Sequence, residues 1–278
     1  MARRRLDAEL TRRGLARSRE QAQALIASGA VTIRGTVATK AATQVETSDA
    51  IEVVTSTDHG YVSRGAVKLN GALDAFSILQ VAGRRCLDAG ASTGGFTQVL
   101  LERGAARVLA VDVGYGQLAW PLRTDDRVVV MERTNVRTLA VADLEFAADL
   151  VVADLSFISL GMVLPALIGC TMPDADLVIM VKPQFEVGRE LVGDGVIRDP
   201  EVRTSAVTSV AARAQALGVE VAGVTASPLP GPSGNVEYFL WLTRGRGGAT
   251  VDGAPHGAPL RDDDLRTAIQ RAVREGPQ

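Results

Sequence analysis

The stretch RCLDAGASTGGFTQVLLERGA, residues 85–105, decides the fold of this chain. A short apolar run that reaches Leu87 indicates a buried strand, a glycine-rich turn follows, and apolar residues then recur at helical spacing. Gly90, Gly94 and Gly95 have no Cβ atom, so their backbone can adopt positive φ angles and let a ligand lie against peptide N–H groups at the start of a helix. The stretch therefore predicts a strand, a turn that binds a small molecule, and a helix.

The spacing within this turn favours S-adenosylmethionine as the ligand. A dinucleotide-binding turn requires G-x-G-x-x-G, whereas Ser92 occupies the second glycine position here, and no Lys-Ser or Lys-Thr follows Gly95 as a P-loop would require. The turn opens with Asp88, and a second apolar strand leads to Asp112. In S-adenosylmethionine-dependent enzymes such a loop faces the amino-acid end of the methyl donor, and the acid after the second strand takes the ribose hydroxyls. For the loop alone, another nucleotide or a purely structural turn are the alternatives.

The predicted donor site draws on the turn, on the end of the second strand and on two later loops. Its residues are Asp88, Gly90, Ala91, Ser92, Thr93, Gly94, Gly95, Phe96, Asp112, Asn135 and Asp154. Asp88, Ser92 and Thr93 can hydrogen-bond the amino-acid end of the donor. Asn135 is a candidate for the adenine edge or an ordinary turn asparagine, and Phe96 either packs in the core or touches the ligand.

Charge is distributed unevenly along the chain. The 278 residues carry a net charge of −2, but residues 1–40 hold nine basic against three acidic residues, so this segment carries +6 and the remainder −8. A basic N-terminal segment followed by a mildly acidic remainder suggests a polyanion-binding module attached to a second unit. With 46% hydrophobic residues, the length suits one large or two unequal domains.

The cysteine and histidine content points away from metal chemistry. Cys86 and Cys170 lie in apolar segments without metal-ligand spacing, and the chain has only two histidines, so we predict reduced core thiols, no metal site and a cytoplasmic protein. No apolar segment typical of a signal peptide follows the basic N-terminus, and no run of about 18 apolar residues occurs. Neither secretion nor membrane spanning is expected.

The N-terminal residues predict a compact α/β module. One helix carries Leu6, Leu10 and Leu15 and ends at Gly14, and a second helix begins at Ser18. Strands are expected at 31–35 and 51–54. The pattern RLDAELTRRGLARSREQAQALIASGAVTIRG followed by SDAIEVV resembles the alpha-L RNA-binding domain found in ribosomal protein S-four and in pseudouridine synthases.

That resemblance implies that basic residues of this module contact RNA phosphates, with salt-dependent affinity and limited sequence selectivity. A solvated basic surface without a partner is the alternative. Basic residues of the body, including Arg137, could extend the positive track toward the catalytic edge. The predicted RNA-binding residues are Arg3, Arg4, Arg5, Arg17, Arg19, Lys40, Arg64 and Arg133.

Beyond the module, apolar strands alternate with helices. A helix that carries Lys68 precedes strands near 85–88, 107–112, 127–131, 149–154, 176–181, 219–225 and 236–242. Alternation of this kind predicts a parallel sheet covered by helices on both faces. The last strand is expected to be antiparallel, and apolar residues from Leu260 to Val273 suggest a helix that packs back on the body.

Four charged residues are expected to meet at one edge of this sheet. Asp154 and Lys182 directly follow apolar strands, and reactions in open parallel sheets occur at the carboxyl ends of the strands. An antiparallel last strand would start at the same edge and bring Glu237 there, and Lys68 can reach it from the preceding helix. Two cations and two anions can share a partly buried site without net charge. Ordinary ion pairs at strand ends are the alternative.

The order and context of these four residues resemble the Lys-Asp-Lys-Glu tetrad of FtsJ-like ribose 2′-O-methyltransferases. With the alpha-L domain in front, the chain resembles the TlyA (haemolysin A-like) family over essentially its full length. The segments that carry the resemblance are VSRGAVKL, LDAGASTGGFT, VDVGYGQLAW, VVADLSFISL, VKPQFEVG and PGPSGNVEYFLW. The resemblance implies a Rossmann-like class I methyltransferase sheet and S-adenosylmethionine-dependent methylation of cytidine ribose in ribosomal RNA of both subunits.

The domain boundaries expected from this pattern are an RNA-binding domain at 1–57, a linker at 58–63, a methyltransferase domain at 64–244, and a flexible linker with a C-terminal helix at 245–278.

A ribose hydroxyl releases its proton reluctantly, so the reaction needs a base within hydrogen-bond reach. We assign that role to Lys182. Burial and the second cation, Lys68, would lower the pKa of Lys182, whereas the nearby carboxylates would oppose this shift. Asp154 would orient Lys182, and Glu237 would position Lys68 or the ribose.

Two further segments could contribute to the site. Phe157 is expected to pack in the core by default, with the adenine or target-base pocket as the alternative. Residues 183–200 suggest a loop that closes over RNA.

Three other functions compete with this hypothesis. A catalytically inert RNA-binding or assembly factor would be expected to lack a tetrad residue or the glycines, and neither is missing. A membrane-active haemolysin is suggested by the family name alone. A base methyltransferase would more usually carry an Asn/Asp-Pro-Pro-aromatic signature or a catalytic cysteine, and ADLSF is neither.

Overall fold

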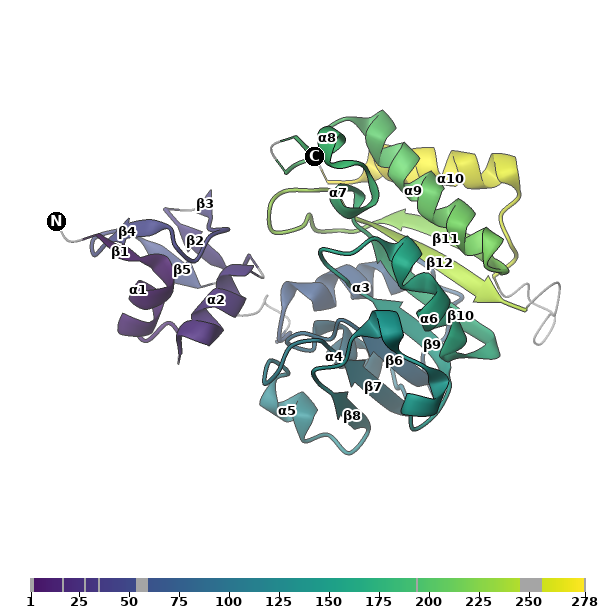
Figure 1. Ribbon diagram of the computed structural model, residues 1–278, viewed down its shortest axis with the longest axis horizontal. Helices are drawn as coiled ribbons and strands as arrows, with labels where there is room; N and C mark the ends of the chain where they lie inside the picture. Colours follow the sequence, from purple (N-terminus) through teal and green to yellow (C-terminus); the bar gives the residue numbers. More distant parts are fainter. Residues whose placement is uncertain are drawn as a thin grey trace.

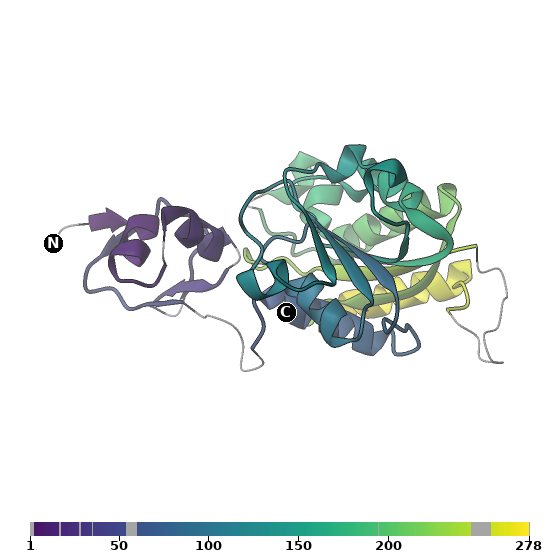
Figure 2. The same ribbon diagram turned by 90° about the horizontal axis from the view of Figure 1, so that it is seen from below.

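The computed structural model describes residues 3–16, 18–27, 29–34, 36–53, 60–193, 195–245 and 257–277. Figures 1 and 2 show the N-terminal elements as a small body beside a larger one that is built on a single sheet. Among the described helices, none combines the length and the apolar composition needed to cross a membrane.

The N-terminal body consists of two short helices and two small antiparallel sheets. Its elements are β1 (Arg3–Arg5), α1 (Leu6–Arg12), α2 (Arg19–Ala27), β2 (Val31–Ile33), β3 (Thr36–Val37), β4 (Gln44–Glu46) and β5 (Ile51–Val53). Strand β1 pairs with β4, and β2 lies between β3 and β5. The body has a core of its own, in which Leu6, Leu10 and Ile26 are almost completely buried. The first helix ends before the expected position, because Gly14 adopts a φ angle of 71° and Leu15 already lies outside the helix.

The larger body is a seven-stranded sheet in the order β11-β12-β10-β9-β6-β7-β8. Its strands are β6 (Arg85–Ala89), β7 (Arg107–Val111), β8 (Val128–Met131), β9 (Ala148–Ala153), β10 (Thr171–Val181), β11 (Val219–Ala226) and β12 (Tyr238–Arg244). The helices are α3 (Arg64–Ala75), α4 (Gly95–Glu102), α5 (Trp120–Arg123), α6 (Leu164–Gly169), α7 (Pro183–Glu186), α8 (Arg189–Val192), α9 (Pro200–Ala216) and α10 (Asp262–Glu275). The predicted α/β fold with a mostly parallel sheet is confirmed.

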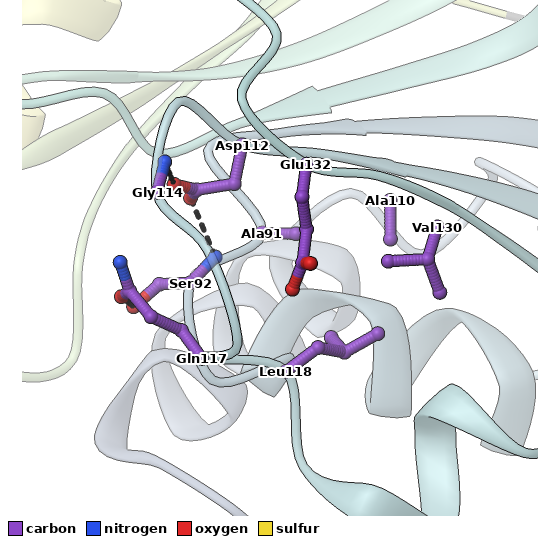
Figure 3. A pocket seen from close by; sticks show the side chains of 9 residues that line it. All are labelled: Ala91, Ser92, Ala110, Asp112, Gly114, Gln117, Leu118, Val130 and Glu132. Carbon is purple, nitrogen blue, oxygen red and sulfur yellow. Dashed lines mark hydrogen bonds between the residues drawn. The ribbon is translucent and has the colours of Figure 1, made fainter. Parts of the chain in front are cut away.

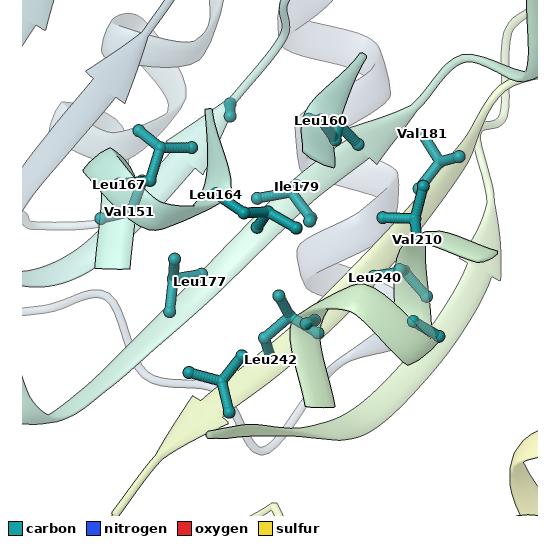
Figure 4. Packing of buried hydrophobic residues seen from close by; sticks show 14 of the residues in the cluster. Val151, Leu160, Leu164, Leu167, Leu177, Ile179, Val181, Val210, Leu240 and Leu242 are labelled. Atoms are coloured by element: carbon teal, nitrogen blue, oxygen red, sulfur yellow. The ribbon is translucent and has the colours of Figure 1, made fainter. Parts of the chain in front are cut away.

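Alternate residues of the strands pack against helices on opposite faces of the sheet. Cys86 and its neighbours on one face pack with α3 and α4, whereas Leu87 and its neighbours on the other face pack with α6, α9 and α10. Figure 4 shows part of the second cluster, in which Leu164 and Leu167 of α6 lie close to Leu177 of β10. Because both faces are covered, the strands carry nearly continuous apolar runs, which is why the sequence shows them without alternation.

The last strand is antiparallel, as expected. Strand β12 pairs antiparallel with β10, with Tyr238 opposite Val181, and antiparallel with β11. Its first residue therefore lies at the edge where the parallel strand β10 ends. This arrangement brings Glu237 next to Lys182 although 54 residues separate them in the sequence.

Two predicted segments differ from the structure or lie outside it. Residues 183–200 are not one loop, because they form the short helices α7 and α8 before α9 begins. The expected C-terminal helix is present as α10 and packs against β11 and α9. The flexible linker expected after residue 244 falls largely on 246–256, outside the described residues.

Candidate active site

The glycine turn between β6 and α4 is packed so closely that side chains would not fit. A Cβ atom on Gly90, which has a φ angle of 88°, would lie 2.5 Å from the backbone oxygen of Asp154. At Gly94, with a φ angle of 98°, it would meet the side chains of Leu118 and Leu122. The glycines therefore let the backbone of the turn pass close to its neighbours where a side chain would collide, and the N–H groups of Gly90, Ala91 and Gly94 already donate to backbone oxygens.

The acid after the second strand organises the other wall of the turn. Oδ2 of Asp112 accepts a hydrogen bond from the backbone N–H of Ser92 at 2.8 Å, and Oδ1 accepts one from the N–H of Gly114 at 2.6 Å (Figure 3). Ser92 adopts the left-handed region, with a φ angle of 47°, and its hydroxyl donates to Gln117 at 3.3 Å. The carboxylate that was expected to take ribose hydroxyls thus also fixes the turn.

Asp88 lies beneath the turn instead of facing a ligand. Its side chain is completely buried, and Oδ2 accepts a hydrogen bond from the hydroxyl of Thr97 at 2.7 Å. Desolvation raises the pKa of Asp88 to about 7, although the Thr97 hydrogen bond opposes this shift. This position differs from the expected contact with the amino-acid end of the donor. The first helical turn of α4 and the end of β6 are instead held together by the Asp88 carboxyl group.

Four charged side chains form two ion pairs at the carboxyl edge of the sheet. Nζ of Lys182 lies 2.6 Å from Oδ1 of Asp154, and Nζ of Lys68 lies 2.5 Å from Oε2 of Glu237. The side chains of Lys68, Lys182 and Glu237 are at most 10% exposed, whereas Asp154 is 23% exposed. The structure brings all four predicted residues together, with Lys182 beside Asp154 as expected and with Glu237 beside Lys68, which was one of its two expected partners.

The structure settles the balance of opposing effects on the pKa of Lys182, which the sequence left open. Burial alone would lower this pKa, but the carboxylates of Asp154 and Glu237 outweigh burial, so the pKa of Lys182 lies above its ordinary value. Burial alone would raise the pKa of Asp154, but the charges of Lys182 and Lys68 outweigh it, and this pKa is lowered. Both members of the pair are therefore charged at neutral pH.

A single cleft of about 940 Å³ connects the ion pairs with the glycine turn. The predicted residues that line it are Lys68, Gly90, Ala91, Ser92, Thr93, Gly95, Phe96, Asp112, Asn135, Asp154, Lys182 and Glu237. Asp88 and Gly94 do not line it. Phe96 is 3% exposed and also packs against Phe239 with the ring centroids 6.1 Å apart, so it serves core and cleft together.

Phe157 is not a core residue. Its side chain is 90% exposed at the cleft, its φ angle is 64°, and its ring centroid lies 5.2 Å from that of Phe185. A left-handed backbone is an outlier for a bulky side chain, so the conformation of Phe157 points to a constraint at this position. Asn135 also lines the cleft, but its Oδ1 accepts the backbone N–H of Arg137 at 3.0 Å, as a turn asparagine would.

The predicted RNA-binding residues lie in several surroundings. Arg3, Arg4, Arg5, Arg19 and Lys40 are exposed on the N-terminal body, whereas Arg17 lies outside the described residues. Arg64 lines the cleft and donates to the backbone oxygen of Pro230 at 3.3 Å. Arg133 is exposed, and its guanidinium carbon lies 4.4 Å from the ring centroid of Tyr115.

Sequence reasoning missed several residues of the cleft. Ser156 accepts a hydrogen bond from Nζ of Lys182 at 2.9 Å, and its place in ADLSF two residues after Asp154 was the available signal. Asn235 is 2% exposed and connects two loops, since its amide donates to the oxygen of Gly195 at 2.7 Å and accepts from the N–H of Ile197 at 2.9 Å. No sequence pattern indicates that contact.

The residues at the turn fit S-adenosylmethionine. The turn has no room for Cβ atoms at the glycines, and its residues line the cleft together with Asp112. The second part of the same cleft is lined by the two lysine–carboxylate pairs. The site thus combines a small-molecule cradle with a cluster of ionisable side chains.

Comparisons with known proteins agree with this geometry. Residues 61–244 match the model of the FtsJ-like methyltransferases, and residues 4–51 match the S4 domain. The chain is 61% identical, over the whole length of both proteins, to the 16S/23S rRNA (cytidine-2'-O)-methyltransferase TlyA of Mycobacterium tuberculosis. It is 37% identical to Hemolysin A of Brachyspira hyodysenteriae, over 84% of this chain and 98% of that protein.

A solved structure from Streptococcus thermophilus, which carries a provisional hemolysin name, is 36% identical and covers 99% of this chain and 96% of its own with a TM-score of 0.72. The two family models together, and the full-length relative by itself, cover both bodies of the structure. The chain therefore belongs to the TlyA-type FtsJ-like methyltransferases, enzymes that carry an S4 domain in front of the methyltransferase sheet.

Proposed function

We propose that this enzyme transfers a methyl group from S-adenosylmethionine to the 2′-oxygen of cytidine ribose in ribosomal RNA of the small and the large subunit. The observation that carries the proposal is the cleft in which the Lys182–Asp154 pair adjoins the glycine turn. The substrate class follows the name of the full-length relative with 61% identity. A cytoplasmic location is part of the proposal, because ribosomes are the substrate.

Donor binding is assigned to the turn and to Asp112. The residues between Gly90 and Gly95 that line the cleft would hold the amino-acid end, and the Asp112 carboxylate would take the ribose hydroxyls. Bound S-adenosylmethionine supplies a methyl group that is already activated by a positively charged sulfur. Asp88 supports the turn from below through Thr97.

Proton removal is assigned to Lys182. Its Nζ would accept the proton of the 2′-hydroxyl group while the ribose oxygen becomes the nucleophile. Lysine can do this only as the neutral amine, and the raised pKa means that the amine is charged in the resting enzyme. Asp154 and Ser156 hold Nζ in place, and Lys68, paired with Glu237, would stabilise the developing negative charge on the oxygen.

RNA binding is assigned to both bodies. We propose that residues 1–57 form the RNA-binding domain, 58–63 the linker, 64–244 the methyltransferase domain and 245–278 a linker with a C-terminal helix. The exposed arginines of the first domain would bind phosphates. Phe157, exposed beside the ion pairs, would stack on a base near the reacting ribose, which explains an aromatic side chain that is 90% exposed.

Methyl transfer to unmodified ribosomal subunits tests the proposal. Tritium from labelled S-adenosylmethionine is expected in both subunits, and nucleoside analysis is expected to place it on the ribose of cytidine. Label on a base would indicate a base methyltransferase. RNA binding without any transfer would indicate an inert assembly factor, and lysis of erythrocytes without transfer would favour the haemolysin.

A further inference from the structure

A buried carboxylate in the N-terminal body contacts two exposed arginines. Asp7, the second residue of α1, has a completely buried side chain. Its Oδ1 accepts a hydrogen bond from Nε of Arg5 at 3.1 Å, and its Oδ2 accepts one from Nη2 of the same guanidinium at 3.0 Å. Nη2 of Arg19, at the start of α2, lies 3.5 Å from Oδ1. One carboxylate thus connects two arginines from different elements.

The remaining capacity of this carboxylate is used by neutral donors. Nε2 of Gln23 donates to Oδ2 at 3.2 Å, and the backbone N–H of Ala8 donates to Oδ1 at 2.9 Å. The pKa of Asp7 is held well below its usual range, chiefly by the hydrogen bonds of Arg5. Asp7 is therefore charged and fixed in place whenever the module is folded.

About half of each arginine side chain stays exposed to solvent. Their side chains are 45% and 58% exposed, for Arg5 and Arg19 respectively. A guanidinium has five N–H donors, and the pair with Asp7 uses two of those on Arg5, which leaves Nη1 and one hydrogen of Nη2 for another oxygen ligand. Anchoring one edge of a guanidinium in this way leaves the other edge directed at solvent.

We infer that Asp7 is a positioning residue for RNA binding, which holds Arg5 and Arg19 in the geometry that receives phosphate groups. The inference rests on the proposed RNA-binding function and adds to it an acidic residue with a favourable role. An arginine that is already ordered loses less side-chain freedom when it binds phosphate, so the affinity gain comes from pre-organisation.

Charge alone predicts the opposite effect. Removal of a negative charge from a surface that binds RNA strengthens the electrostatic attraction, so Asp7→Asn should tighten binding if Asp7 only repels phosphates. If Asp7 positions the arginines, the same substitution should weaken binding about tenfold, because two flexible side chains must then be ordered on binding. The sign of the change therefore separates the two explanations.

Glu9 provides a matched control on the same helix. It is also completely buried, and it pairs with Arg12 at 2.6 Å and with Arg13 at 2.8 Å, but it contacts neither Arg5 nor Arg19 among the described contacts. Binding of the full-length Asp7→Asn, Asp7→Glu and Glu9→Gln variants to unmethylated ribosomal subunits is measured with purified subunits at fixed salt. Thermal melting of each variant is followed in parallel, and Asp7→Ser replaces Asp7→Asn if the latter does not fold.

The variant with both Arg5→Ala and Arg19→Ala completes the experiment. If Asp7 acts through these arginines, Asp7→Asn weakens binding on the wild-type background and has little further effect on the double variant. Asp7→Glu, which keeps the carboxylate, is expected to retain more affinity than Asp7→Asn, and Glu9→Gln is expected to bind at least as well as wild type.

The remaining results overturn the inference in distinguishable ways. Unchanged or tighter binding by Asp7→Asn, equal losses in Asp7→Asn and Glu9→Gln, or a full additional loss on the double variant would each show that Asp7 does not position the arginines. If the double arginine variant itself binds like wild type, the proposed RNA contact of these arginines fails first, independently of Asp7.

Discussion

Nζ of Lys182 lies 2.6 Å from Oδ1 of Asp154, at the ends of two neighbouring parallel strands. This short distance explains why the pKa of Lys182 is raised although the side chain is only 10% exposed. The pair is stable as two charges, so the lysine is held in position but must lose a proton before it can act as a base. The ion pair with Asp154 therefore holds Lys182 in position but also makes the loss of its proton less favourable.

Replacement of Lys182 tests the proposed base. Lys182→Met is expected to lower methyl transfer at least about 100-fold, a range typical of a lost general base, while S-adenosylmethionine still binds. Lys182→Arg keeps the charge beside Asp154, but arginine does not release its proton, so this variant is expected to be equally inactive. Single-turnover transfer and calorimetric donor binding check both variants. Substantial activity of Lys182→Arg would show that the positive charge, not proton acceptance, is what the reaction needs.

The pH dependence of the reaction follows from the raised pKa of Lys182. Below this pKa the fraction of neutral amine grows about tenfold per pH unit, so single-turnover rates are expected to rise with pH throughout the range from about 6.5 to 9. Glu237→Gln removes one of the carboxylates that raise the pKa, and its pH–rate profile is expected to shift to lower pH. A wild-type rate that does not change between these pH values would contradict the assignment.

Because Phe157 is exposed, its replacement is expected to weaken RNA binding and to leave the free energy of unfolding nearly unchanged. Because the side chain is 90% exposed, Phe157→Ala should change the free energy of unfolding by less than about 0.5 kcal/mol. Loss of a stacked base should weaken RNA binding by about 1–3 kcal/mol and raise KM accordingly, with donor binding unchanged. Trp120→Ala is the control, since Trp120 is 72% exposed and is not among the residues that line the cleft. Equal effects of both variants would refute a specific role for Phe157.

Asp88 predicts a pH-dependent contribution to stability. In the unfolded chain the carboxyl titrates near 3.8 and in the folded protein at about 7, so between these values the folded state holds a proton that the unfolded state has lost. The free energy of unfolding therefore falls as pH rises through this interval, by roughly 4 kcal/mol for this group. Asp88→Asn does not titrate and should gain stability relative to wild type between pH 4 and 7. The free energies of unfolding of wild type and Asp88→Asn are measured by urea titration at several pH values. A difference between the two proteins that stays constant from pH 4 to 7 would show that the pKa of Asp88 is not raised.

Substitution of two glycines with similar φ angles distinguishes the cost of backbone strain from the cost of a steric clash. Gly90 and Gly83 have φ angles of 88° and 75°, but a Cβ atom would meet the Asp154 oxygen only at Gly90 and has open space at Gly83. Gly83→Ala is expected to cost about 1 kcal/mol of folding free energy from backbone strain alone. Gly90→Ala should cost roughly 3 kcal/mol and abolish donor binding, because the turn must move. Similar melting temperatures and donor affinities for the two variants would contradict the close packing of the turn.

Much of the sheet and of the cleft was predictable because the signals are local. Apolar runs set the strands, the glycines set the turn, and the rule that strand ends share an edge placed Asp154 and Lys182 together. The expectations that were wrong concern the surroundings of individual side chains in the folded protein. Nothing local shows that Asp88 lies under the turn or that Phe157 is exposed, since the neighbours that decide burial come from other parts of the chain.

The sequence by itself determined the order of strands and helices, the glycine turn and the identity of the four charged residues, because each depends on residues adjacent in the chain. Only the tertiary structure decided that Glu237 pairs with Lys68, in which direction the pKa of Lys182 moves, and that Asp7 contacts both Arg5 and Arg19. Lys68 and Glu237 are 169 residues apart in sequence and 2.5 Å apart in space. Ion pairing and desolvation depend on such distances, which are fixed only when the chain is folded.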